Sequence, residues 1–192
     1  SWPTMALEII ISVIILAFIL EFFDASGGMG YGTLTPILLL LGFAPLEVIS
    51  AVIITSAVLS LFAGFLHHGF HNIDFLLNTN PKPLSILVSF VVIALIIGAF
   101  VAVNIPEKFL RLYIGLLIIG IGISILMHHK KHKFSWKRLI AFGSLASFNK
   151  GISGGGYGPV LAGGQIIAGI KSKHAVGITA LSEGIVSSIG FL

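Results

Sequence analysis

The sequence predicts an all-α polytopic membrane protein, and its composition carries that prediction. Of its 192 residues, 56% are hydrophobic and only 9% are charged, and the mean hydropathy is +1.09. Soluble domains carry about 25% charged residues, because they must cover their surface with polar groups. The 23 glycines are typical of membrane helices, which pack closely through small residues. A soluble globular domain is therefore excluded, and we expect the lipid bilayer to surround the protein.

Apolar runs indicate where the chain crosses the bilayer. Four runs are about long enough to span roughly 30 Å of hydrocarbon. They are residues 5–23, 48–66, 84–103 and 109–127. A weaker run covers 139–148, and a further one begins near residue 175. Two shorter stretches, 34–43 and 160–170, cover about half of the hydrocarbon at roughly 1.5 Å per residue. We expect these two either to be re-entrant or to continue into full crossings.

Basic residues indicate the orientation. The densest basic cluster is residues 128–133, followed by Lys137 and Arg138. By the positive-inside rule, this loop is expected on the cytoplasmic side of a prokaryotic cytoplasmic membrane. Most of the net charge of +4 is concentrated here, so the cluster is a topology signal and no nucleic-acid partner is expected.

Two glycine-rich segments indicate an internal repeat. GMGYG at 28–32 matches GGGYG at 154–158, at an offset of 126 residues that also superimposes the flanking apolar helices and polar turns. We therefore expect a first transmembrane repeat at 5–132 and a partial second repeat at 133–192, whose C-terminal helices are missing. Five elements in each copy would invert the second copy, whereas four crossings would make the copies parallel. The inverted form, with broken or re-entrant helices near the midplane, is the one we favour.

The glycine-rich breaks are candidate anion-binding sites. Non-helical backbone at membrane depth is tolerated where it is buried in protein or lines a cavity. A break followed by a new helix presents N–H groups and a positive dipole end, which favour an anion. The expected ligands are Gly28, Gly30, Tyr31, Gly32, Thr33, Lys150, Gly154, Gly155, Gly156, Tyr157 and Gly158. The alternative is that the glycines only allow helices to pack closely.

Few charged residues lie near the breaks. Asp24 and Lys150 occupy equivalent positions in the two copies. Ionisable groups inside a membrane are expensive and usually face a partner or a pathway. Lys150 is the natural countercharge for an anion, while Glu21, Asp24 or Glu183 could carry a coupling proton. A structural Asp24–Lys150 ion pair is the alternative interpretation.

Two segments resemble the sulfite exporter TauE/SafE family of membrane permeases. They are SGGMGYGTLTPILLLLGF at 26–43 and NKGISGGGYGPVLAGGQIIAG at 149–169. The resemblance implies an inner-membrane carrier of small sulfur anions such as sulfite, sulfonates or sulfoacetate, with no cofactor. It leaves the substrate, the direction of transport and the choice between proton and sodium coupling open. Family members are longer than this chain, so a second copy or a complementing fragment is a further expected partner.

The histidines and the catalytic motifs bear on two other interpretations. His67 and His71 share an HHxxH spacing with His128 and His132, and histidines one helical turn apart can bind a metal ion. No carboxylate other than Asp74 lies close to them, so histidines in interfacial loops are the favoured account. No nucleophile elbow, Walker loop or HExxH motif is present, so an enzyme is not expected. A passive anion channel remains the alternative to a secondary transporter.

Overall fold

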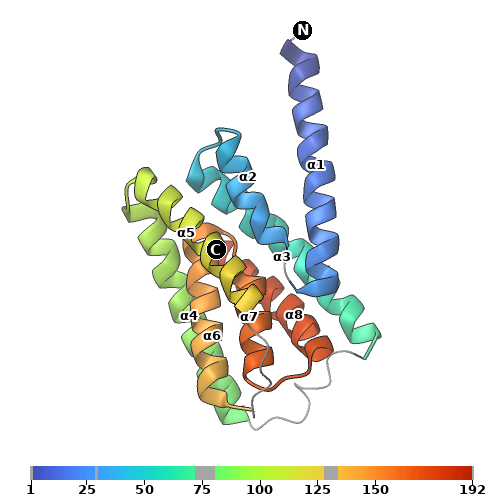
Figure 1. Ribbon diagram of the computed structural model, residues 1–192, viewed down its shortest axis with the longest axis vertical. Coiled ribbons are helices and arrows are strands. Elements are labelled where there is room, and N and C mark those ends of the chain that lie inside the picture. Colours follow the sequence, from blue (N-terminus) through green and yellow to red (C-terminus); the bar gives the residue numbers. More distant parts are fainter. Residues whose placement is uncertain (1, 29, 72–80, 128–133, 192) are drawn as a thin grey trace.

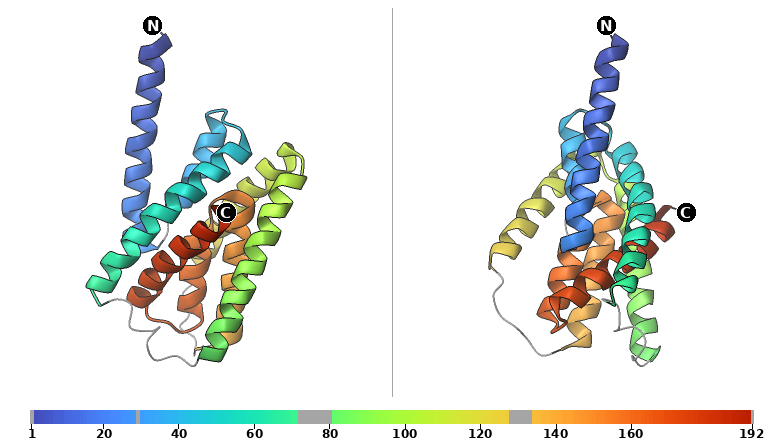
Figure 2. Two further views of the ribbon diagram at one scale, coloured as in Figure 1. Left: turned by 180° about the vertical axis from the view of Figure 1, so that it is seen from behind. Right: turned by 90° about the vertical axis from the view of Figure 1, so that its right-hand side faces the viewer.

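The computed structural model describes residues 2–28, 30–71, 81–127 and 134–191, and all regular structure in these ranges is helical (Figure 1). The prediction of an all-α fold is confirmed. The elements are α1 (Trp2–Gly27), η1 (Tyr31–Thr33), α2 (Leu34–Leu40), α3 (Pro45–Gly69), α4 (Pro81–Asn104), α5 (Glu107–Met127), α6 (Trp136–Ser153), α7 (Tyr157–Ile167) and α8 (Ser172–Phe191). The α-helices form a bundle, and α1 projects beyond its upper end (Figures 1 and 2).

Each apolar run of the sequence lies wholly or mainly in a helix, but α6 is much longer than its apolar run. The run covers 139–148, whereas the helix continues to Ser153. Its last two turns carry Ser147, Asn149 and Lys150, all at most 1% exposed. These polar side chains face other helices instead of water. A prediction from hydropathy alone therefore ends this helix too early.

Glycines bring α4 and α6 together. A side chain at Gly98 would clash with the backbone carbonyl of Phe148, and one at Gly151 would clash with the carbonyl of Leu95. The two backbones are therefore in direct contact, as is common where small residues line a membrane helix interface. This contact joins a helix that precedes the loop at 128–133 to one that follows it (Figure 2).

The helices α3 and α8 pack antiparallel. Gly64 of α3 lies against Leu181 of α8, while Leu61 lies against Gly184. The residue number therefore falls along one helix as it rises along the other. This pairing places the middle of α8, which contains Glu183, against the middle of α3.

The outer surface of the bundle is apolar. On α1 the side chains of Ile14, Phe18 and Phe22 are more than 60% exposed. Within the described ranges, Leu7–Gly27 and Pro45–Gly69 are long and apolar enough to cross a membrane. Large exposed apolar side chains on long helices are stable in contact with lipid, so the protein is an integral membrane protein.

Candidate functional site

The two glycine-rich breaks lie against each other. A Cβ atom at Gly32 would come within 2.7 Å of the backbone N of Gly156, and one at Gly155 within 2.7 Å of the carbonyl oxygen of Gly32. A side chain at Gly158 would clash with the carbonyl of Gly28. The contact is formed by backbone atoms and leaves no room for an oxyanion inside it. Any anion that touches both breaks must therefore lie beside this contact.

Left-handed glycine conformations create both breaks. Gly28 has φ 72° and Gly154 has φ 70°, directly after α1 and α6 respectively. Gly30 and Gly156, at φ 148° and 73°, directly precede the next helical turn. L side chains rarely adopt these conformations, so glycine is required for the chain to leave one helix and start another here.

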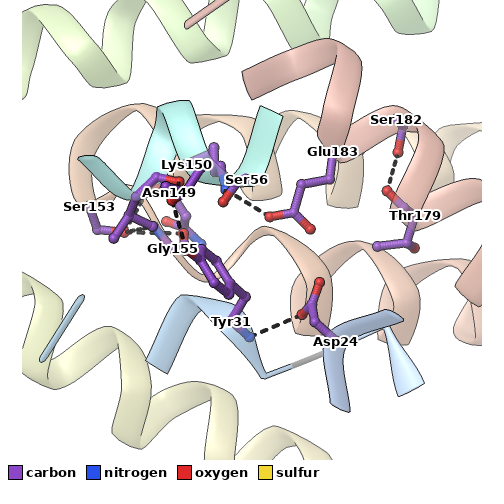
Figure 3. A network of polar contacts seen from close by, with 12 residues as sticks. Asp24, Tyr31, Ser56, Asn149, Lys150, Ser153, Gly155, Thr179, Ser182 and Glu183 are labelled. Carbon is purple, nitrogen blue, oxygen red and sulfur yellow. Dashed lines mark hydrogen bonds and ion pairs between the residues drawn. The ribbon is translucent and has the colours of Figure 1, made fainter. Parts of the chain in front are cut away.

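At the first break, Asp24 accepts a hydrogen bond from the new helical segment. Its Oδ1 atom accepts the backbone N–H of Tyr31 at 3.2 Å, and the side chain is only 5% exposed. The start of a helix favours a negatively charged or acceptor group, because its N–H groups and dipole point outward. The first break thus supplies its own oxygen acceptor, as Figure 3 shows.

Two of the predicted hydroxyl ligands bond within the protein. The Tyr31 hydroxyl donates to Thr55 Oγ1 at 2.7 Å, and the Thr33 hydroxyl donates to the carbonyl oxygen of Gly30 at 2.6 Å. Tyr157 is fully buried and lies on the wall of an apolar cavity of about 170 Å³ between α4, α6, α7 and α8. The hydroxyls of Tyr31 and Thr33 are therefore already engaged within the protein.

At the second break, Lys150 is buried and paired. Its Nζ atom donates to Glu183 Oε1 at 2.7 Å and to Ser56 Oγ at 2.8 Å (Figure 3). The Lys150 and Glu183 side chains are 1% and 4% exposed. The interpretation of Asp24 as the partner of Lys150 is wrong, because the close packing of α3 and α8 brings Glu183 to the ammonium instead.

Several buried polar atoms surround this pair without a hydrogen-bond partner. In the part of the chain that the structure describes, they include Glu183 Oε2, Asn149 Nδ2 and Glu21 Oε2. The Oδ1 atom of that asparagine accepts the hydroxyl of Tyr113. Buried polar atoms are normally paired, so an unpaired group points to strain, water or a ligand. Unpaired buried donors and acceptors therefore occur on α6 and α8, which carry this pair, and on α1.

Carboxyl groups outnumber cations in this cluster. Glu21 and Asp24 of α1 both interact electrostatically with Lys150 and with Glu183. One ammonium group therefore faces three carboxyl groups that come from two helices. All four residues were singled out in the sequence, and the structure brings them together.

Two serines at the site were missed by the sequence analysis. Ser56 binds the ammonium of Lys150. Ser153 stabilises the second break, since its Oγ atom donates to the carbonyl of Asn149 at 2.6 Å and accepts the N–H of Gly155 at 3.2 Å. The available signal was Ser60, one turn after Ser56 in an apolar span and likewise buried. That spacing marks a polar stripe on the inner face of α3.

The histidine motif gains no support as a metal site. His67 lies on α3, and its Nε2 atom hydrogen-bonds the carbonyl oxygen of Ala25 at 2.8 Å. His71 follows the end of α3 with φ 54°. His128 and His132 lie outside the described residues. Within the residues that the structure describes, no group of three or more metal-binding side chains occurs.

Comparisons with known proteins identify a family of membrane proteins. A family model described as sulfite exporter TauE/SafE matches residues 13–192. The chain is 28% identical over 198 residues to the probable membrane transporter protein YtnM of Bacillus subtilis. That alignment covers 94% of this chain and 64% of YtnM, so the chain spans less than two thirds of this relative. No solved structure matches the chain.

Proposed function

Because the chain belongs to the sulfite exporter TauE/SafE family, we propose that it acts in secondary transport of small sulfur-containing anions across a prokaryotic cytoplasmic membrane. The buried Lys150 beside two paired helix breaks is the observation that carries this proposal. Burying an ammonium group at membrane depth costs free energy, and such groups usually line a transport pathway or contact a bound ion. Sulfite and sulfonates present several oxygen acceptors to such a group.

The charged residue beside each break differs, and the positive charge beside the second break favours an anion there. Asp24 supplies a carboxyl oxygen to the start of the helical segment after the first break. Lys150 stands at the equivalent position before the second break, and α7 begins at Tyr157, after the N-cap residue Gly156, without a side-chain cap hydrogen bond. We infer that the anion supplies, near the start of α7, the acceptor oxygen that Asp24 supplies at the first break. Lys150 would be its countercharge.

We also propose that residues 5–132 and 133–192 derive from two copies of one inverted repeat. The bounds support this, because α1 ends at Gly27 and α6 at Ser153, an offset of 126 residues, and the next helical segments begin at Tyr31 and Tyr157 with the same offset. The antiparallel contact of the equivalent helices α3 and α8 supports inversion. Inverted repeats with broken helices around a central site are a recurring transporter plan.

A thermal-shift screen of the purified protein tests the proposed function. Sulfite, thiosulfate, ethanesulfonate, sulfate and chloride would each be added at constant ionic strength. A ligand that binds the folded state raises the unfolding midpoint, so we expect at least one sulfur oxyanion to stabilise the protein more than chloride does. Sodium or a divalent cation stabilising in place of every anion would overturn the proposal.

A lysine pair supplies the matched control for this screen. Lys150→Gln removes the buried ammonium, whereas Lys173→Gln removes an exposed one at the start of α8. Both variants lose one positive charge, so a general charge effect would act equally on both. We expect the stabilisation by sulfur oxyanions to be lost in Lys150→Gln and kept in Lys173→Gln.

A further inference from the structure

The charge balance of the Lys150 cluster limits what can bind there. Glu21, Asp24 and Glu183 face the ammonium, so full ionisation of all four groups gives the cluster a net charge of −2. Unbalanced charge in an apolar interior is strongly unfavourable, and a further anion increases the imbalance. An anion can therefore bind beside Lys150 only if a positive charge enters with it.

Glu183 has the geometry to accept that charge as a proton. Its Oε1 atom accepts a hydrogen bond from Lys150, while its Oε2 atom is buried without a partner in the described structure. Protonation at Oε2 would turn the carboxylate into a neutral acid and weaken its attraction for the ammonium. Ser56 would still hold Nζ in place, because its oxygen accepts a separate N–H of the lysine.

The neighbouring carboxyl groups are less suited to this role. Asp24 uses its Oδ1 atom to accept the N–H of Tyr31 and forms no ion pair with Lys150 in the part of the chain that the structure describes. Glu21 interacts with Lys150 only through space and has no hydrogen bond to it in the described structure. Glu183 is thus the carboxyl group in direct contact with Lys150.

Building on the proposed function, we propose that Glu183 binds a co-transported proton. Protonation breaks the ion pair between Glu183 and Lys150, so that the ammonium of Lys150 pairs with the substrate anion instead. One proton and one monovalent anion enter together. The proton forms an O–H bond on Glu183, and the ammonium keeps all its protons and pairs with the anion. The net charge of the cluster is the same before and after. Proton and anion are therefore carried in the same direction.

Other titratable groups face Glu183 and must be considered in any pH profile. They come from four elements packed around α8: Glu21 and Asp24 of α1, Tyr31 of η1, Lys150 of α6 and Tyr157 of α7. The helix α3 contributes the hydroxyl of Ser56. The two tyrosines titrate near pH 10 in water, well above the range of the experiment. The carboxyl groups of Glu21 and Asp24 are the alternative proton acceptors, and a variant of Glu183 must separate their effect on the pH profile from that of Glu183.

Calorimetric titration of ethanesulfonate into the purified full chain, held in lipid nanodiscs, tests the proposal. This probe is chosen because its charge does not change near neutral pH. Raising the pH removes the proton from Glu183, so the affinity should fall as pH rises, by about tenfold per pH unit where one proton is taken up. The heats measured in buffers of different ionisation enthalpy should give one proton bound per anion.

The variant Glu183→Gln replaces the acid by a neutral side chain of the same size. It should bind ethanesulfonate with an affinity that no longer depends on pH and that matches or exceeds the wild type at high pH. Glu47→Gln, which removes an exposed carboxyl in the first turn of α3, should keep the wild-type slope. A Glu183→Gln protein with the wild-type slope would overturn the proposal and point to Glu21 or Asp24.

The outcomes separate this proposal from the proposed function. Absence of anion binding at every pH contradicts the function itself. Anion binding by the wild type that takes up no proton, or that requires sodium instead, leaves the function standing and overturns the role of Glu183. The proton count uses the wild-type protein, so it decides the matter even if Glu183→Gln fails to fold.

Discussion

Lys150 of α6 and Glu183 of α8 form an ion pair of 2.7 Å, and both side chains are almost completely buried. Two elements meet at this pair: the helix that ends at the second glycine-rich break and the helix that packs against α3. A buried ion pair is weak evidence for stability, since desolvation opposes the Coulomb attraction. Its position beside the paired breaks is what connects it to transport.

The first prediction concerns the stability of this pair. Replacing Glu183 by Leu leaves the buried ammonium of Lys150 without the carboxylate that it contacts, and we expect a loss of about 3–5 kcal/mol. The double variant Lys150→Met with Glu183→Leu removes both charges and should recover most of that loss. Thermal unfolding in detergent micelles measures the difference. A double variant no more stable than Glu183→Leu would show that the pair is not a coupled unit.

The second prediction concerns the contact between the breaks. Gly32→Ala places a methyl group within 2.7 Å of the Gly156 nitrogen, so the two segments must separate. We expect a loss of about 1–3 kcal/mol, the usual effect of overpacking. Gly163→Ala is the matched control, because a Cβ atom there meets nothing within 4 Å. This control lies inside α7 and should be neutral or slightly stabilising, since alanine favours helix over glycine. Equal stability of both variants would contradict the structure at the breaks.

The third prediction concerns orientation. The chain contains no cysteine, so a single introduced cysteine can be labelled without background. Ser135→Cys, directly after the basic loop at 128–133, should react with an impermeant thiol reagent only after cells are opened. Lys108→Cys lies at the start of α5, after the short link from α4, and should react in intact cells. Reversed labelling of the two sites would invert the topology.

The fourth prediction separates a transporter from a channel. Ethanesulfonate uptake into proteoliposomes should saturate with concentration and should increase when an inward proton gradient is imposed. A channel would instead give fast flux that does not saturate and that follows the membrane potential. Lys173→Gln serves as the charge control, because it should leave both properties unchanged.

The apolar runs of the sequence predicted the helices, because burial in lipid requires long apolar segments with satisfied backbone bonds. The glycine-rich segments likewise predicted two breaks, each followed by a short helix. The partner of Lys150 was not predictable by the same reasoning. Equivalence between the copies pointed to Asp24, whereas the partner is fixed by how α6, α3 and α8 pack. Ser56 was missed for the same reason, since its spacing to Ser60 indicates an inward-facing polar stripe but does not reveal which side chain that stripe faces.

The backbone contact at Gly32, Gly155 and Gly156 has a mechanical consequence. Helices that pack through interdigitated side chains shift past each other in discrete steps, because ridges must leave one set of grooves and enter another. The glycine surface has no such ridges and no rotamers to change. A shift of one broken helix along the other would therefore require no side chain to change its rotamer at this contact, and only contacts elsewhere in the bundle would oppose it.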